Sequence, residues 1–199
     1  RNILIFLAAV LLTTAPLLGT YQSNSEFNQR INSVGLLQGN RLQEEMEYTG
    51  LNAIQVLVAQ FFKSTMPFII SEGAFNFFSS PRAYFTPLAA VFLMLGLAVA
   101  VWKLRDLRLL VLLAWFFAPI VLGSALTVGP PSHQRMLGSA PAAAILVALG
   151  LVTVAQALGG LNQLLRRLAP AFLLAVLLFT GYRDMVFYFG EYQIGRAHV

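Results

Sequence analysis

The residue types that could do chemistry gather in one short stretch between two apolar runs, at residues 126–135. This stretch contains two consecutive prolines and places His133 and Arg135 immediately before an apolar run that favours a helix. An arginine at the start of a helix, beside free backbone amides, can bind a phosphate through charge-assisted hydrogen bonds. The same Arg135 would also serve as an anchor for lipid headgroups, and spacing alone favours the anchor. His133 by itself is typical of a solvated loop histidine.

Other catalytic motifs are missing from the sequence. It has no cysteine and two histidines that stand far apart, so neither thiolate chemistry nor a histidine-based metal site is encoded. No glycine-rich phosphate loop precedes a helix, which argues against a nucleotide site of the soluble type. The apolar runs contain no acidic residue, so a proton relay or a cation pathway is disfavoured. We identify no cofactor and no metal ligand, and a dependence on a divalent metal stays open.

Aromatic residues in the stretch 182–192 permit two interpretations. They could form a collar that faces a substrate, because aromatic rings stack on sugars. They could equally form an aromatic belt that holds the last helix at the membrane interface. Both roles require the same residues, and we favour the belt.

The composition is that of an integral membrane protein. Of 199 residues, 58% are hydrophobic and 11% are charged, and the mean hydropathy is +0.73. A soluble chain carries roughly 25% charged residues. The net charge of +5 comes from short clusters between apolar runs, so a basic groove for nucleic acid is disfavoured.

Long apolar runs predict one all-α membrane domain, a polytopic bundle of about five transmembrane helices. A bilayer core about 30 Å thick requires about 20 apolar residues in a helix. Candidate spans cover residues 3–19, 83–102, 109–129, 136–158 and 165–182. The last is the weakest, because its uncharged core is short. It must tilt little, include Leu164 and Leu165, or continue past Arg183 and Asp184.

The short links between these spans predict an orientation. One side of the bundle holds six basic residues and one acidic residue, namely Arg1, Lys103, Arg105, Arg108, Arg166, Arg167 and Asp106. The positive-inside rule applies to such short links and assigns this side to the cytoplasm. We therefore expect a plasma (inner) membrane protein whose segment 20–82 and tail 183–199 are extracytoplasmic.

A further helix is predicted within the extracytoplasmic segment. One arc of a helical wheel holds Leu51, Ile54, Leu57, Val58, Phe61 and Phe62. The opposite arc holds Asn52, Gln55, Gln60 and Lys63, with Val56 as the exception. The pattern is too short to span a membrane. It fits an interfacial helix or a helix of a small exterior lobe, and we weigh the two equally.

Several motifs in order resemble a known family. PRAYFTPL at 81–88 opens a span, LAWF occupies 113–116, and GPPSHQRMLG at 129–138 is followed by APA at 140–142. An aromatic stretch, YFGEY, follows at 188–192. Together they resemble the later transmembrane part of bacterial glycosyltransferase family 39, which includes the protein mannosyltransferases and the aminoarabinose transferase of lipid A. The likeness extends along nearly the whole chain.

The resemblance implies an enzyme of the GT-C type that works at the extracytoplasmic face with a polyprenyl-phosphate sugar as donor. In that family the catalytic acidic residue lies in the first extracytoplasmic loop, which we expect upstream of Arg1. We therefore assign no catalytic base to Glu26 or Glu72. For Arg135, and more loosely for His133, the resemblance favours contact with the donor phosphate.

Two functions of different classes follow. The first is part of a membrane glycosyltransferase that moves a sugar from a polyprenyl-phosphate donor to an extracytoplasmic acceptor. The alternative is a non-catalytic accessory subunit of a larger membrane complex. The expected partners are membrane lipids, the polyprenyl-phosphate sugar and other membrane subunits, and not nucleic acid.

Overall fold

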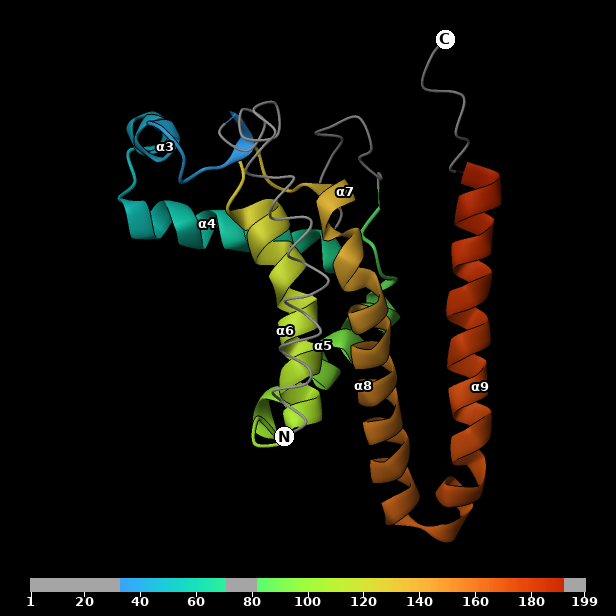
Figure 1. Cartoon of the computed structure of the whole chain (residues 1–199). Helices are drawn as coiled ribbons and strands as arrows, with labels where there is room; N and C mark the ends of the chain where they lie inside the picture. Colours follow the sequence, from blue (N-terminus) through green and yellow to red (C-terminus); the bar gives the residue numbers. More distant parts are fainter. Residues whose placement is uncertain (1–32, 71–81, 192–199) are drawn as a thin grey trace, which may run out of the picture.

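The computed structural model describes residues 33–70 and 82–191, and helices are labelled as in Figure 1. This part of the chain is mainly helical and contains no strand. Its one isolated β-bridge pairs Gly35 with Thr127. The all-α prediction is confirmed for these residues. The predicted span at 3–19, the parts of the exterior segment at 20–32 and 71–81, and the tail from 192 on lie outside the described residues.

Within residues 33–70 and 82–191, three helical stretches are long and apolar enough to cross a membrane. They cover Leu107–Ala125, His133–Leu161 and Gln163–Gly190. The last two contain α8 (Ala140–Leu161) and α9 (Gln163–Val186), an antiparallel pair joined at the lower end of Figure 1. These stretches confirm a membrane protein with helices of transmembrane length and composition. The five-span bundle stays a prediction.

Helix α9 is longer than the apolar run that predicts it. It starts where the Asn162 side chain accepts a hydrogen bond from the Leu165 N–H, at 2.8 Å. It passes through Arg183 and Asp184 and continues as the π-helical turn Phe187–Glu191. Charged residues do not break a helix. Of the alternatives predicted for the short fifth run, the structure therefore shows the helix that continues past Arg183 and Asp184.

Helix α5 (Pro87–Trp102) begins at a local cap inside the predicted run 83–102. The Thr86 hydroxyl accepts a hydrogen bond from the Ala89 N–H. Pro87 occupies the first turn, where an N–H has no partner within the helix, so the missing N–H of proline costs no hydrogen bond. Residues 82–86 therefore approach the helix in a non-helical conformation.

Helix α6 (Leu107–Ile120) ends in an irregular turn because of a proline. Pro119 has no N–H to donate to the carbonyl four residues earlier, and the chain continues as the π-helical turn Val121–Ala125. This turn leads into the loop that carries His133 and into the short helix α7 (His133–Met136).

Helices α5 and α8 cross with their backbones in contact. A Cβ atom added to Gly96 would lie 2.7 Å from the carbonyl carbon of Leu146, and one added to Gly150 would lie 2.9 Å from that of Phe92. Real Cβ atoms do not approach so closely. Ala100 and Ala143 are fully buried in the same core. Small residues thus allow the close helix packing typical of membrane bundles.

Helices α3 (Arg41–Thr49) and α4 (Ala53–Thr65) lie at the upper end of Figure 1, where α4 runs across the direction of α8 and α9. The face of α4 that packs on the protein holds Val56, Gln60 and Ser64, all buried. Ile54, Val58 and Phe62 are exposed instead. The predicted helix exists, but the division of its faces is different: the exceptional Val56 and the polar Gln60 face the protein.

Candidate functional site

Two adjoining cavities lie at the end of the molecule where α4, α7 and the last turns of α9 are found (Figure 1). The apolar cavity, of about 470 Å³, is lined by Phe68, Tyr84, Phe85, His133, Gln134, Met136, Leu137, Ser139, Ala140 and Ala144. The polar cavity, of about 400 Å³, is lined by Ile69, Arg82, Ala83, Tyr84, Phe85, Thr86, Pro87, Arg183, Asp184 and Phe187. Tyr84 and Phe85 belong to both.

Contacts with Pro67, Phe68 and His133 hold Tyr84 in place. Its backbone N–H donates to the carbonyl of Pro67 at 2.8 Å, and its ring meets the edge of Phe68 at 5.1 Å between centroids. Its hydroxyl forms a hydrogen bond with Nδ1 of His133. The non-helical segment before α5 is therefore tied both to the end of α4 and to the start of α7. The structure brings His133 to the wall of the apolar cavity instead of leaving it in a solvated loop.

A buried hydroxyl pair fixes the loop before α7. Ser124, in the π-helical turn, lies 2.8 Å from the hydroxyl of Ser64 in α4, and both side chains are fully buried. The Ser124 hydroxyl also accepts a hydrogen bond from the Ser132 N–H at 2.9 Å. The loop that precedes His133 is thus attached to α4 through a polar contact shielded from solvent, where such bonds are costly to lose.

Gln60 completes this attachment. When its amide is oriented to donate, its nitrogen lies 2.7 Å from the carbonyl oxygen of Ala125 and 3.2 Å from that of Thr127. The π-helical turn leaves carbonyls without regular helix partners, and a buried glutamine side chain can satisfy them. The helical wheel places Gln60 on the polar arc of its helix. The carbonyls that it contacts lie more than 60 positions along the chain, so no local pattern indicates that its side chain is buried.

Arg135 lies outside the lining of both cavities. It is exposed, and its stem packs against the π-helical turn, since a Cβ added to Gly123 would lie 3.0 Å from the Arg135 Cβ. Two helical positions separate it from His133, so the two side chains leave α7 in different directions. The structure thus separates the two predicted binding residues, and contact of Arg135 with a donor phosphate stays a prediction.

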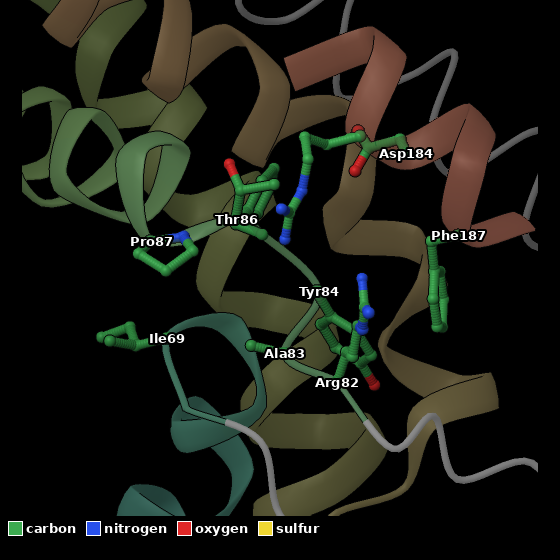
Figure 2. A pocket seen from close by; sticks show the side chains of 10 residues that line it. Ile69, Arg82, Ala83, Tyr84, Thr86, Pro87, Asp184 and Phe187 are labelled. Atoms are coloured by element: carbon green, nitrogen blue, oxygen red, sulfur yellow. The ribbon is translucent and has the colours of Figure 1, made fainter. Parts of the chain in front are cut away.

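The polar cavity contains charged residues that sequence reasoning did not select. Figure 2 shows Asp184, on α9, across the cavity from Arg82 and Thr86. The Arg82 guanidinium lies 4.9 Å from the centroid of the Phe187 ring, within range of a cation–π interaction. A continuation of the last span past Asp184 was one of the alternatives, but no local pattern indicates that this part of the helix lies beside residues 82–87.

No metal centre is found in the described part of the chain, where no three His, Asp or Glu side chains gather closely enough to hold an ion. Comparison of the chain with protein-family models, with curated proteins and with solved structures gave no match.

Proposed function

We propose that this chain is part of an integral membrane glycosyltransferase that uses a polyprenyl-phosphate sugar as donor. The observation that carries the proposal is the pair of adjoining cavities, one apolar and one with Arg82, Arg183 and Asp184 in its wall. A lipid-linked sugar has the same division into an apolar chain and a charged, hydroxyl-bearing head. An apolar pocket beside a few convergent polar groups is the usual form of a ligand site.

In this proposal the isoprenoid chain lies against Phe68, Phe85 and Met136. The phosphate lies in the polar cavity beside Arg183, and the Tyr84–His133 pair marks the junction between head and chain. An arginine suits a phosphate because it offers several N–H donors in a planar fork. Asp184 and Thr86 offer hydrogen-bond acceptors for sugar hydroxyls. We assign no catalytic base among the described residues.

The proposal includes the predicted topology. The cavities are extracytoplasmic, the links at residues 103–106 and 161–163 are cytoplasmic, and the membrane is the plasma membrane. It rests on the basic excess in these links and in the beginnings of α6 and α9, at the end of Figure 1 opposite the cavities.

A binding experiment separates the two candidate phosphate contacts. The protein that contains this chain is reconstituted in nanodiscs, and its affinity for radiolabelled undecaprenyl phosphate is measured, with undecaprenol as the uncharged control. Arg183→Ala should weaken binding of the phosphate by on the order of tenfold, the scale of a lost hydrogen bond to a charged group, and leave undecaprenol unaffected. Arg41→Ala, in the exposed helix α3, is the matched control.

Arg135→Ala in the same assay tests the prediction from the resemblance. A tenfold loss there, with Arg183→Ala neutral, would move the phosphate to the α7 side. If neither substitution changed binding, the phosphate site would be absent from this part of the chain.

One observation favours the alternative, a non-catalytic accessory subunit. In the most apolar 18 residues of the Gln163–Gly190 stretch, only 6% are buried. The exposed side chains include Leu174, Leu177, Leu178 and Phe179. Such a surface suits a partner helix as well as lipid. An accessory subunit should copurify with a second membrane protein and bind undecaprenyl phosphate no better than undecaprenol.

A further inference from the structure

A third cleft lies at the opposite end of the molecule, between α8 and α9 near their link. Its volume is about 540 Å³. Ala155, Gly159 and Ala169 form an apolar floor of small residues, and Ala155 is buried. Gln156 and Arg166 line the same cleft and are exposed. The cleft thus has an apolar interior and a polar, cationic rim.

Small residues keep this cleft open. A Cβ added to Gly159 would meet the Cα of Arg166 at 3.5 Å, so the backbones of the two helices approach closely at the link. Farther along, Val152 and Leu173 line the sides of the groove, and Val152 is 41% exposed. This shape suits a hydrocarbon chain lying between α8 and α9, with a headgroup at Arg166.

The charge around the cleft is strongly positive. The two links at this end, together with the beginnings of α6 and α9, hold five cations and one carboxylate, namely Lys103, Arg105, Arg108, Arg166, Arg167 and Asp106. The Asp106 carboxylate accepts a hydrogen bond from the Arg108 N–H as the cap of α6. An ion pair between Arg41 and Glu44 lies in α3, at the opposite end of the molecule. No described carboxylate neutralises the cations around the cleft.

The neighbouring apolar side chains indicate the kind of anion. Leu161, Leu164 and Leu168 flank the arginines and are at least half exposed. A soluble anion would leave these side chains and the apolar floor uncovered, whereas a membrane lipid covers them and supplies the negative charge.

We propose that the α8–α9 cleft binds an anionic phospholipid of the leaflet at this end of the protein. The phosphate pairs with Arg166 and accepts a hydrogen bond from the Gln156 amide, and one acyl chain follows the groove between Val152 and Leu173. This site shares no residue with the proposed donor site, from which residues 174–182 of α9 separate it.

The test is native mass spectrometry of the purified protein with phosphatidylglycerol or phosphatidylcholine of identical acyl chains. Phosphatidylglycerol should bind at least fivefold more tightly than phosphatidylcholine. Arg166→Ala should abolish this preference, and Arg166→Lys should retain part of it, because lysine keeps the charge without the planar fork. Arg108→Ala is the matched control: it removes a cation at the same end but does not line the cleft.

A second variant tests the groove separately from the charge. Gly159→Leu should fill the floor and weaken both lipids, while circular dichroism and gel filtration report whether the variant folds. Millimolar inorganic phosphate should not compete. The proposal is overturned if phosphatidylcholine binds equally well, if Arg108→Ala matches Arg166→Ala, or if free phosphate displaces the lipid.

Discussion

The two helix pairs that share α8 are packed in opposite ways. At the α5–α8 crossing, glycines bring the backbones into contact, and Leu93, Ala143 and Leu146 are buried. At the α8–α9 pair, Val176 is the buried residue of α9, and both the polar cavity and the α8–α9 cleft border that helix. The first pair is tightly packed, whereas open space borders α9. We therefore expect the charged head of the proposed donor and the proposed lipid to contact α9.

The largest effect should come from closing the α5–α8 crossing. Gly150→Leu would place a side chain against the backbone of Phe92, so the helices must separate. The loss should exceed the about 1–3 kcal/mol of ordinary overpacking, and the variant should fail to fold. Gly181→Ala in α9 is the control, since a Cβ there meets nothing within 4 Å. It should fold normally, and equal expression and thermal stability of the two variants would contradict the contrast.

Truncating one leucine of α8, at its crossing with α5, and one leucine of α9 sharpens the comparison. Leu146 is fully buried, whereas Leu177 of α9 is 60% exposed. Leu146→Ala should lower the free energy of unfolding in detergent by about 2–5 kcal/mol through lost packing and a residual cavity. Leu177→Ala should change it by less than about 0.5 kcal/mol, as surface substitutions do. A large loss for Leu177→Ala would mean that a partner covers α9.

Removing one buried hydroxyl should loosen the loop before α7. Ser124→Ala leaves the Ser64 hydroxyl and the Ser132 N–H without their partner, at a cost of about 1–3 kcal/mol. Hydrogen exchange should rise across residues 129–136 and in α4. Thr49→Ala removes an exposed hydroxyl bond to the Glu45 carbonyl and should leave both regions unchanged. If exchange at 129–136 did not respond to Ser124→Ala, this contact would not hold the loop.

The smallest effect compares two faces of α4. Val56 is 2% exposed and Val58 is 48% exposed, so the same substitution removes different amounts of packing. Val56→Ala should cost about 1.6 kcal/mol, the transfer free energy of two methylene equivalents, and Val58→Ala should cost little in detergent. In liposomes, a triple variant that combines Val58→Ala with Ile54→Ala and Phe62→Ala should increase the hydrogen exchange of α4 if lipid covers that face in the interface. Unchanged protection would favour a helix of an exterior lobe.

Much of the helical fold could be predicted, because lipid-compatible helices are long apolar runs and Thr86, Asp106 and Asn162 are recognisable caps. The extent of α9 was harder to predict, since Arg183 and Asp184 end an apolar run without ending a helix. The 126–135 loop brings His133 to a cavity, and the binding role of His133 stays a prediction. Its partner Tyr84 and the residues Arg82 and Asp184 come from distant segments, and no local pattern reports such contacts.

Photo-crosslinking tests the proposed donor site most directly. A polyprenyl phosphate with a diazirine near its head is irradiated with the reconstituted protein, and the labelled peptides are identified by mass spectrometry. We expect labelling at residues 67–69, 82–87 and 183–187, and we expect excess undecaprenyl phosphate and Arg183→Ala each to reduce it. Labelling spread along the exposed face of α9, insensitive to the competitor, would contradict a donor site in these cavities.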